Sequence, residues 1–426
     1  MNATGHLPGE PEAAVPRVVL GVAGGIAAYK SCEVVRRLRD HGVVVDVVPT
    51  PSSLNFVGLA TWQALSGRPV ATDVWSDITE VPHVRLGQQA DLIVVAPATA
   101  DLLARAAQGR ADDLLTNVLL TARCPVVMFP AMHTEMWQHA ATTANVATLR
   151  SRGVVVKDPA SGRLTGADIG AGRLPEPAEV VDIVLQLLEG GADAARKAAE
   201  HDLSGRRVVI SAGGTREYLD PVRFLGNSSS GLMGVALARE AALRGAEVTL
   251  VAAHVETELP SGVVIERVSS TTDLRDAMVG LARDAEVVIM AAAPADFTPA
   301  QASDTKIKKN GDGGLDLDLV QTPDVLAGLA ASKPDGQVLV GFAAETAPDR
   351  EELIGLGRTK LAHKGCDLLV LNDVSGGKVF GLATTSVVVL GADGPLSAVT
   401  GSKSAAAAAI IDAAAQRLVP RTPRQG

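Results

Sequence analysis

The most constraining feature of the sequence is a repeated opening, in which a strand of apolar residues runs into a pair of glycines. RVVLGVAGG near the N-terminus leads into a helical pattern and a second apolar run, and RRVVISAGGT repeats the opening halfway along the chain. In the first copy we expect strand 17–22, a turn at Gly24 and Gly25, helix 26–40 and strand 43–48. Alternation of this kind predicts doubly wound parallel sheets with right-handed crossovers.

Length and composition indicate two α/β domains. The chain has 426 residues, 47% of them hydrophobic but only 3% aromatic, so the cores must consist largely of aliphatic side chains, as in parallel sheets covered on both faces. Between the two halves the strand pattern gives way to Gly, Ala and charged residues. We therefore predict two Rossmann-like domains, 16–188 and 206–420, joined by a linker at 189–205.

Charge and cysteine content exclude several classes of protein. The net charge of −9 gives no support to a nucleic-acid partner. Cys32, Cys124 and Cys366 are far apart and form no CxxC pair, which argues against a disulfide framework or zinc site and favours the cytoplasm. The first 15 residues resemble a loose tail rather than a signal peptide, and no apolar run is long enough to predict a membrane span.

The stretch FPAMHTEMWQHA invites a metal-site interpretation. His133 and His139 lie six positions apart, which on a helix separates them by roughly 240°. A two-histidine zinc motif needs neighbouring positions on one face. We therefore expect another explanation for this stretch, with Met132, Met136 and Trp137 as core residues or as the wall of a pocket.

Several features of the first half allow either a purely structural or a functional interpretation. The Gly24-Gly25 turn could cradle a phosphate or be an ordinary tight turn. TPSSLNF and APATADLL follow the next strands, so three loops could form one crevice for a phosphorylated cofactor. His83, in a polar segment before a buried strand, is either structural or an acid/base residue.

In the second half, residues suited to a triphosphate recur. REYLDPVRFLGNSSS is a long insertion before the next helix, and long loops are often functional. A hairpin-like excursion follows around KIKKNGDGGLDLDLV, whose lysines, Lys306, Lys308 and Lys309, would usually be a solvated charge run. Asp296 follows a buried strand, and Lys360 and Lys364 recur later in the sequence. These residues favour a functional interpretation of the lysines, because a carboxylate for magnesium and several lysines suit a triphosphate.

Together these motifs carry a resemblance. GGIAAYK, TPSSLNF, PHVRL, APATADLLARAAQGRADDLL and PAMHTEMW resemble the flavin-dependent cysteine decarboxylases, which implies a flavodoxin-like N-terminal domain. SAGGTREYLDPVRFLGNSSSG, KIKK and GFAAE resemble the phosphopantothenate–cysteine ligases. The whole chain thus resembles bifunctional enzymes of coenzyme A biosynthesis, which ligate cysteine to 4′-phosphopantothenate through an acyl-cytidylate and then decarboxylate the product to 4′-phosphopantetheine.

The resemblance also implies residue roles in the first half. His83 would be the acid/base residue, and the substrate would contact His133, Met136 and the flap position Gly166. FMN would be held by Gly24, Gly25, Thr50, Ser53, Phe56, Ala98 and Thr99. Three positions depart from the family pattern: Ala23 replaces a serine, His133 an asparagine and Gly166 the flap cysteine that is thought to donate a proton.

In the second half the resemblance implies CTP as co-substrate and a Mg²⁺ ion at Asp296. Asn227 and Lys306 would be catalytic. The nucleotide would contact Gly213, Gly214, Asp296, Lys306, Phe342, Lys360 and Lys364. Leu232 replaces a lysine and Pro294 a valine of the family pattern.

The resemblance further implies a homo-oligomer, with trimeric decarboxylase domains and dimeric ligase domains that could combine into a dodecamer. Two alternatives stay open at this point. One is an active ligase with an impaired decarboxylase, because of Ala23, His133 and Gly166. The other is a non-catalytic regulatory subunit, against which the retained His83, Asp296 and lysines argue.

Overall fold

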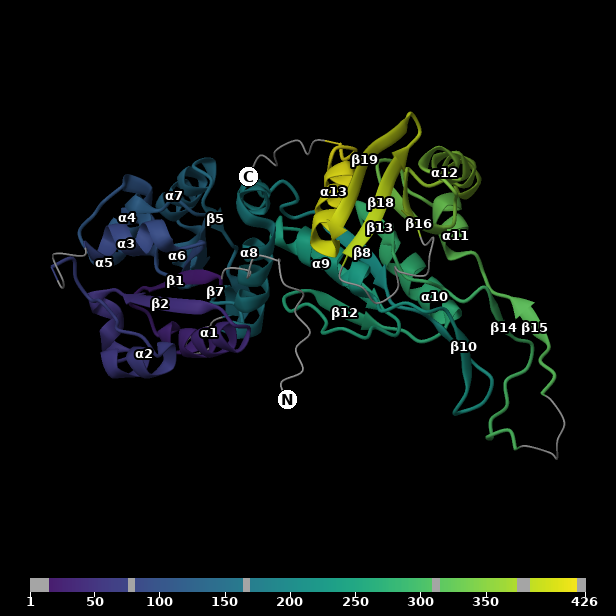
Figure 1. Ribbon diagram of the computed structural model, residues 1–426, viewed down its shortest axis with the longest axis horizontal. Helices are drawn as coiled ribbons and strands as arrows, with labels where there is room; N and C mark the ends of the chain where they lie inside the picture. The colour runs from purple at the N-terminus through teal and green to yellow at the C-terminus, as the bar shows by residue number, and fades with distance from the viewer. Residues whose placement is uncertain (1–14, 76–80, 164–168, 309–314, 374–383, 420–426) are drawn as a thin grey trace, which may run out of the picture. The chain divides into compact units, whose positions relative to one another are not determined.

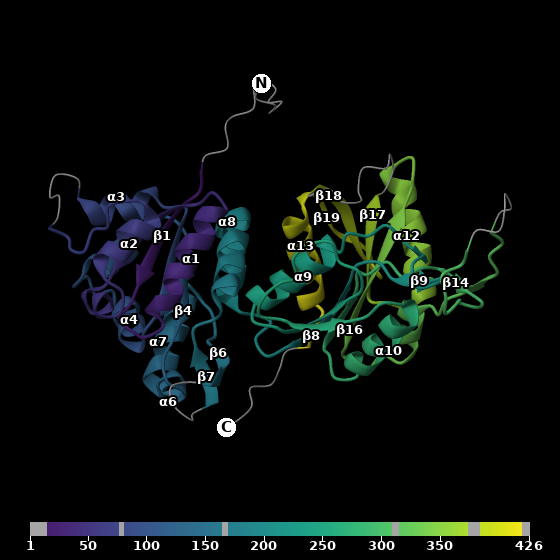
Figure 2. The ribbon, with the colours of Figure 1, turned by 90° about the horizontal axis from the view of Figure 1, so that it is seen from below.

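A computed structural model describes residues 15–75, 81–163, 169–308, 315–373 and 384–419. The chain divides into two compact units, residues 1–199 and 200–426. Each is described by itself below and in Figures 1 and 2. Gly166, Lys309 and the predicted N-terminal tail up to residue 14 lie outside the described residues.

The first unit is built on a five-stranded parallel sheet of order β2-β1-β3-β4-β5. Its strands are β1 Arg17–Val22, β2 Val44–Pro49, β3 Leu92–Ala98, β4 Val126–Pro130 and β5 Val155–Val156. Every residue of β3 is buried, as expected for a strand covered on both faces. The predicted first βαβ unit is confirmed, and the strand order is that of flavodoxin-like folds.

Helices cover both faces of this sheet. They are α1 Ala28–Asp40, α2 Leu59–Ser66, α3 Pro82–Gln89, α4 Ala100–Gln108, α5 Leu114–Thr121, α6 Thr134–Gln138, α7 Ala140–Ser151 and α8 Pro177–Glu200, with a 3₁₀ turn η1 Pro51–Asn55. Side chains of α3, α4, α5 and α7 form one core cluster, and α1 and α2 lie on the opposite face (Figure 1). A hairpin of β6 Ala160–Arg163 and β7 Ile169–Arg173 follows β5.

The segment predicted as a linker is largely helical. Helix α8 continues to Glu200, with a break at Gly191, where φ is 59° and ψ is −147°. Alanines 195, 198 and 199 are buried, so this part of α8 has an apolar face although its sequence lacks large apolar residues. Small side chains and the kink explain why the sequence pattern predicts a linker where the chain is helical.

The second unit contains an eight-stranded sheet of order β12-β11-β8-β13-β16-β17-β18-β19. Its strands are β8 Arg207–Ala212, β11 Glu247–Ala252, β12 Val264–Arg267, β13 Val287–Met290, β16 Val338–Glu345, β17 Leu368–Asp373, β18 Thr384–Gly391 and β19 Gly394–Ser402. The pairs from β12 to β17 are parallel, and β18 and β19 are antiparallel additions. The predicted α/β class with two Rossmann-like units is thus confirmed.

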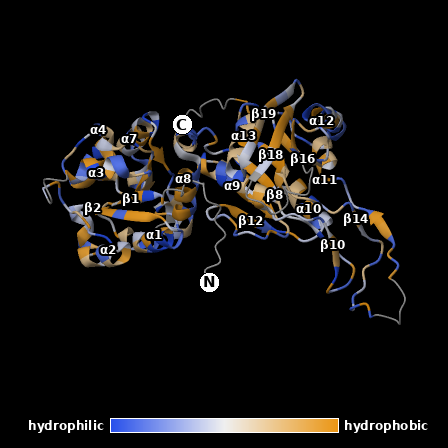
Figure 3. Ribbon diagram, viewed as in Figure 1, coloured by the Kyte–Doolittle hydropathy of each residue, from blue (hydrophilic) through white to orange (hydrophobic). Residues whose placement is uncertain are grey.

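Two helical layers bury this sheet. Helices α9 Leu232–Leu243 and α13 Lys403–Ala415 contribute to one core cluster, whereas α10 Thr271–Ala282, α11 Val325–Ala331 and α12 Arg350–Lys364 contribute to the other. Strands such as β8 and β18 are largely apolar in Figure 3. No helix among the described residues is long and apolar enough to cross a membrane.

Two short hairpins interrupt the βα alternation. Strands β9 Arg216–Tyr218 and β10 Phe224–Gly226 form the first, inside the segment predicted as a long loop. Strands β14 Phe297–Pro299 and β15 Leu319–Gln321 form the second and flank the lysine-rich excursion (Figure 1). Strands β14 and β15 pair in antiparallel fashion on either side of the excursion, whose residues 309–314 lie outside the described residues. The pairing of β9 with β10 was not predicted.

Candidate functional sites

The first site lies at the carboxyl edge of the first sheet. In the order β2-β1-β3-β4-β5 the winding of the chain reverses its direction between β1 and β3. The turn after each strand lies at this edge of the sheet. Gly24 and Gly25 follow β1, η1 follows β2, and Thr99 follows β3. The three loops singled out in the sequence therefore meet at one topological switch point.

Close packing explains the glycine at position 24. A Cβ atom there would lie only 2.3 Å from Ser52 Oγ, so any side chain would displace the loop after β2. That loop is itself fixed: Ser53 Oγ donates to the Thr50 carbonyl at 2.7 Å, and the Thr50 and Ser52 hydroxyls lie 3.1 Å apart. Thr50 and Ser53 are buried. The loops after β1 and β2 are therefore packed closely against each other and held in one conformation.

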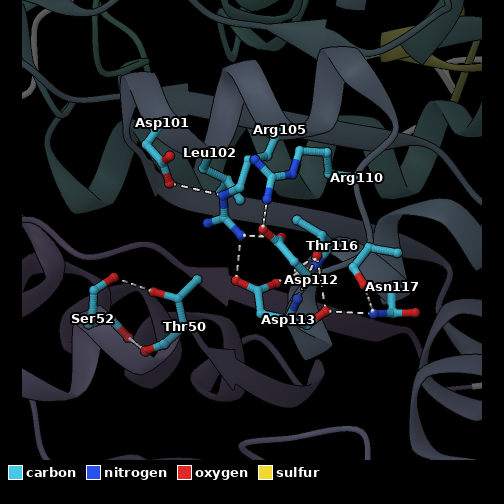
Figure 4. Close-up of polar contacts among 12 residues, drawn as sticks. Thr50, Ser52, Asp101, Leu102, Arg105, Arg110, Asp112, Asp113, Thr116 and Asn117 are labelled. Atoms are coloured by element: carbon cyan, nitrogen blue, oxygen red, sulfur yellow. Dashed lines mark hydrogen bonds and ion pairs between the residues drawn. The ribbon is translucent and has the colours of Figure 1, made fainter.

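The third loop is held by a charge network (Figure 4). Thr99 caps α4, its Oγ1 accepting from Leu102 N–H at 3.3 Å. One turn further, the Arg105 guanidinium contacts Asp101 at 2.9 Å and also the two acids before α5, at 3.0 Å for Asp112 and 2.7 Å for Asp113. Burial alone would lower the pKa of Arg105, but these carboxylates raise it, so the side chain stays charged. This network fixes α4 relative to α5 behind the Thr99 turn, and no sequence pattern indicated it.

His83 lies in the first turn of α3, with a buried imidazole Nδ1 that has no hydrogen-bond partner among the described residues. A buried polar atom without a partner is uncommon and often belongs to a ligand site. The backbone carbonyl of His83 accepts from Thr121 Oγ1 at 2.8 Å, which fixes α3 to α5. Thus His83 has a fixed main chain and a side chain able to serve a ligand.

The stretch around His133 separates into exposed and packed side chains. His133 is exposed and precedes α6 without a side-chain capping bond, and Met136 is 46% exposed. Met132 and Trp137 pack against the core of the unit, in line with one of the two interpretations given above. Phe56, expected at the flavin, is 47% exposed. His133 and Met136 are therefore accessible to a substrate.

His139 has a local structural role. Its Nδ1 accepts from Ala141 N–H at 3.2 Å and caps α7. In the described part of the chain no group of three or more His, Cys, Asp or Glu side chains could hold a metal ion. Of the two histidines in this stretch, His139 therefore caps a helix, whereas the side chain of His133 makes no capping bond.

The second site is a cavity of about 390 Å³ near the ends of β13 and β16. Four residues singled out in the sequence, from segments far apart, line it: Asp296, Phe342, Lys360 and Lys364. Gln321 to Leu326 close another side, so β15 and the start of α11 belong to the same cavity. Convergence of this kind requires the folded sheet, because the residues span almost 70 positions of the sequence.

Both cavity lysines have carboxylate partners. Lys360 Nζ lies 2.6 Å from Glu345, and Lys364 pairs with Asp324, the residue that caps α11. Burial alone would raise the pKa of Asp324, but the Lys364 contact and the hydrogen bond from Ala327 N–H lower it. The cavity therefore keeps its cations in place by internal pairing, and an incoming phosphate would compete with carboxylates.

Backbone contacts join the glycine turn to Asn227. Gly213 has φ +83°, and a Cβ at Gly214 would lie 2.6 Å from the Asn227 carbonyl oxygen. Asn227 Nδ2 donates to the Pro294 carbonyl at 2.7 Å. Asn227 thus bridges the turn after β8 and the loop after β13, and the proline at 294 is compatible with this bond because only its carbonyl takes part.

Threonines fix the peptide that precedes Asp296. Thr215 Oγ1 accepts from Ala295 N–H at 2.8 Å, and Thr322 Oγ1 donates to the Ala295 carbonyl at 2.6 Å. Thr322 N–H also donates to the Asp296 carbonyl at 3.0 Å. Sequence reasoning missed these residues, because a threonine in a loop carries no distinctive pattern.

The lysine-rich excursion is anchored by Asp220. The buried Asp220 carboxylate accepts from Ile307 N–H at 3.1 Å and from Arg223 Nη1 at 2.5 Å. Burial alone would raise the pKa of Asp220, but three backbone hydrogen bonds and the Arg223 charge outweigh it and lower the pKa. Lys306, next to Ile307, is exposed. Asp220 therefore fixes the main chain beside Lys306 and leaves the side chain of that lysine accessible.

Comparison with known proteins identifies both halves. Residues 9–189 match the Flavoprotein family, and residues 203–418 match the family described as DNA/pantothenate metabolism flavoprotein, C-terminal domain. The coenzyme A biosynthesis bifunctional protein CoaBC of Mycobacterium tuberculosis (strain ATCC 25618 / H37Rv) is 55% identical over 93% of this chain and 96% of its own length. The chain belongs to the CoaBC family.

More distant members of the family match along the same extent. CoaBC of Vibrio cholerae serotype O1 is 40% identical over 93% of this chain and 96% of its own length. Among solved structures, the FMN-binding protein AtHal3 is 31% identical, covers 41% of this chain and 97% of its own, and gives a TM-score of 0.38. Membership of a family of bifunctional enzymes confirms the resemblance and does not favour the regulatory alternative.

Proposed function

We propose that this bifunctional enzyme of coenzyme A biosynthesis couples 4′-phosphopantothenate to cysteine at the expense of CTP and then decarboxylates the product to 4′-phosphopantetheine. The observation that carries the proposal is the convergence of Asp296, Phe342, Lys360 and Lys364 on one cavity. A carboxylate, an aromatic face and two lysines are the groups that a magnesium nucleotide requires. CTP rather than another nucleotide is inferred from the family resemblance.

In the ligase half, the substrate carboxylate forms a bond to the α-phosphorus of CTP and pyrophosphate leaves. Lys360 and Lys364 are suited to bind the phosphates. To do so, each lysine would leave its carboxylate partner, Glu345 or Asp324, and pair with a phosphate instead. Asp296 would hold Mg²⁺, which commonly uses one or two protein carboxylates, and the ion would supply positive charge that offsets the charge of the phosphates.

The second ligase step forms the amide. The amine of cysteine attacks the acyl carbon of the acyl-cytidylate, the C–N bond forms and CMP leaves. Asn227 uses one amide N–H for Pro294 and has a second that can donate to the reacting group. Lys306 would serve this transfer. Lys306→Gln should slow amide formation, and normal CMP release coupled to amide formation in that variant would remove its assignment.

In the decarboxylase half, FMN would be held by the loops of Gly24, Thr50, Ser53 and Thr99, because a glycine turn and a helix N-terminus at the carboxyl edge of a parallel sheet suit a phosphate. When bound, the flavin supplies reversible two-electron oxidation of the substrate's cysteine side chain. His83 would hold or accept the proton that moves during this chemistry. His133 would donate an imidazole N–H to the departing carboxylate. Because Gly166 has no proton to give, the last protonation needs water or another group.

The experiment that tests the proposal is mass spectrometry of the full chain incubated with 4′-phosphopantothenate, cysteine, CTP, magnesium and FMN. Phosphopantetheine with stoichiometric CMP and carbon dioxide is the expected result. Accumulation of phosphopantothenoylcysteine would mean that the changes at Ala23, His133 and Gly166 impair the first half. Absence of CMP from a folded sample would overturn the ligase assignment.

The oligomeric state is part of the same proposal. Exposed apolar side chains occur in the loops near Gly25, namely Ile26, Tyr29 and Phe56, and on the hairpins of the second unit, namely Tyr218, Val222, Phe224, Phe297, Leu319 and Val320. Exposed apolar surfaces commonly mark interfaces. The trimeric and dimeric stoichiometries follow from the family resemblance, and light scattering of the full chain and of interface variants would test them. The cytoplasmic location stays a prediction.

A further inference from the structure

Helix α3, which carries His83, begins with a strained backbone. Val81 precedes the helix with φ 43° and ψ 70°, in the left-handed region that a β-branched side chain rarely adopts. The Val81 carbonyl nevertheless accepts from the N–H groups of Val84 and Arg85, at 3.0 and 3.2 Å, as in a regular first turn. Backbone strain of this kind persists only where the surrounding structure enforces it. A contact from elsewhere in the unit must therefore hold the first turn of α3 in place.

Thr121, the last residue of α5, supplies such a contact. Its Oγ1 donates to the His83 carbonyl at 2.8 Å and also lies 3.1 Å from the carbonyl oxygens of Asn117 and Val118 in its own helix. A hydroxyl has a single proton, and the shortest of these contacts is the one that joins the two helices. Because the accepting carbonyl belongs to His83 itself, the bond fixes the main chain that carries the imidazole.

Gly87 lets α3 and α5 approach one another closely enough for this bond. A Cβ at Gly87 would lie 2.3 Å from Thr121 Oγ1 and 3.0 Å from the Val118 carbonyl oxygen, so no side chain fits between the helices at this point. The Gly87 carbonyl also accepts from Arg123 N–H at 3.2 Å, just beyond the end of α5. His83 and Gly87 lie about one helical turn apart. Thr121 therefore contacts α3 at two successive turns of the same face.

The other end of α5 is fixed to α4. Asp113 caps α5 by accepting from Thr116 N–H at 2.8 Å, and its carboxylate also pairs with the Arg105 guanidinium at 2.7 Å (Figure 4). Asn117 Nδ2 donates to the Asp113 carbonyl at 2.9 Å. Arg105 belongs to α4, the helix that starts at the Thr99 turn of the first candidate site. Because α5 is anchored at both ends, a contact with it gives α3 a fixed reference point.

We propose that Thr121 is a positioning residue for decarboxylation, which holds His83 where its imidazole can reach the proton that moves. The inference rests on the proposed function, in which His83 holds or accepts that proton. A side chain that transfers a proton must come within hydrogen-bond reach of it, and a displacement of about 1 Å can lower the rate by about 10²-fold. Loss of the Thr121 bond lets the strained turn at Val81 relax, and this relaxation displaces His83.

The test is steady-state decarboxylation of supplied phosphopantothenoylcysteine by the FMN-loaded full chain at several pH values. Thr121→Val keeps the shape of the side chain without the hydroxyl. It should lower kcat by about tenfold and change KM by less than about twofold, because proton transfer rather than substrate affinity is affected. The pH profile of kcat should shift as well, since a displaced imidazole has different surroundings. Thr121→Ser keeps the hydroxyl and should restore most of kcat, and equal losses in the two variants would overturn the proposal.

A second variant disturbs the same contact from α3, and two controls make the comparison specific. Gly87→Ala would place a Cβ 2.3 Å from Thr121 Oγ1 and should lower kcat at least as much as Thr121→Val. Thr148→Val removes a hydroxyl of α7 that donates to the Ala144 carbonyl of the same helix at 3.0 Å. Gly280→Ala adds a methyl group to α10 where no atom lies within 4 Å. Both controls should leave kcat unchanged, and ligation should be unchanged in every variant.

Chemical modification of His83 separates this inference from the proposed function. Diethyl pyrocarbonate transfers an ethoxycarbonyl group to an accessible imidazole nitrogen, and mass spectrometry of the peptide that contains His83 gives the rate. Thr121→Val should raise this rate by about fivefold, as expected for loss of one hydrogen bond, and Thr148→Val should not. If the wild-type chain does not decarboxylate, the proposed function of the first half fails, whereas the modification rates still show whether Thr121 holds His83. Unchanged kcat in folded Thr121→Val, or a modification rate equal to that of wild type, would overturn the proposal.

Discussion

The two units begin with the same strand and double glycine but form their candidate sites from different groups. In the first unit α1 follows the turn at once, and the candidate site consists of closely packed loops with buried hydroxyls at Thr50 and Ser53. In the second unit the hairpin β9–β10 separates the turn from α9, and the cavity is lined by charged side chains with carboxylate partners. A steric change should therefore harm the first site most, and a charge change the second.

The largest expected effect is confined to the first unit. His83→Asn keeps a polar side chain but removes the imidazole proposed to move the proton, so decarboxylation should fall by about 10²–10⁴-fold. Ligation should continue, and phosphopantothenoylcysteine should accumulate in the mass spectrum. Undiminished decarboxylation would show that His83 is a structural histidine, whereas loss of ligation as well would show that the two units are not functionally separate.

A charge change in the second unit should give the converse result. Asp296→Asn preserves shape but removes the carboxylate proposed for magnesium, so ligation should fall by about 10²–10³-fold, as when a preorganised charge stabiliser is removed. Decarboxylation of supplied phosphopantothenoylcysteine should be unaffected. The measurement is CMP release as a function of magnesium concentration; a normal magnesium dependence would contradict the assignment.

A purely steric change should distinguish the closely packed loops of the first unit from the charged cavity of the second. Gly24→Ala would place a Cβ 2.3 Å from Ser52 Oγ, and overpacking of this kind costs about 1–3 kcal/mol. FMN affinity should fall by about 10- to 100-fold in a fluorescence titration, with ligation unchanged. Gly58→Ala, where no atom lies within 4 Å, is the matched control. Equal FMN affinity in the two variants would mean that the loop after β2 adapts freely.

The smallest expected effect concerns the peptide before Asp296. Thr322→Val removes the hydrogen bond from Oγ1 to the Ala295 carbonyl, a loss of about 1 kcal/mol, or about fivefold. The effect should appear in KM for magnesium more than in the free energy of unfolding. Thr322→Ser should restore most of it, because the hydroxyl is retained. A Val variant with normal magnesium dependence would leave Thr322 without a positioning role.

Prediction from the sequence succeeded where the signal was local and periodic. The apolar run 17–22, the glycine turn and helix 26–40 were located to within two residues of β1 and α1, because burial on both faces of a parallel sheet leaves a continuous apolar pattern. The helical pattern of the second part of α8 was not recognised from the sequence, because small alanines stand there in place of large apolar residues. The pairing of β9 with β10 was missed because each strand has only three residues.

The sequence by itself determined the fold class, the family and the identity of the candidate residues, because glycine turns and apolar strands are local requirements of the backbone. Only the tertiary structure decided which residues meet. Asp296 and Lys364 line one cavity, and Asp220 fixes the chain beside Lys306. Those contacts join positions far apart in the chain, and strand order, which no local pattern encodes, brings them together.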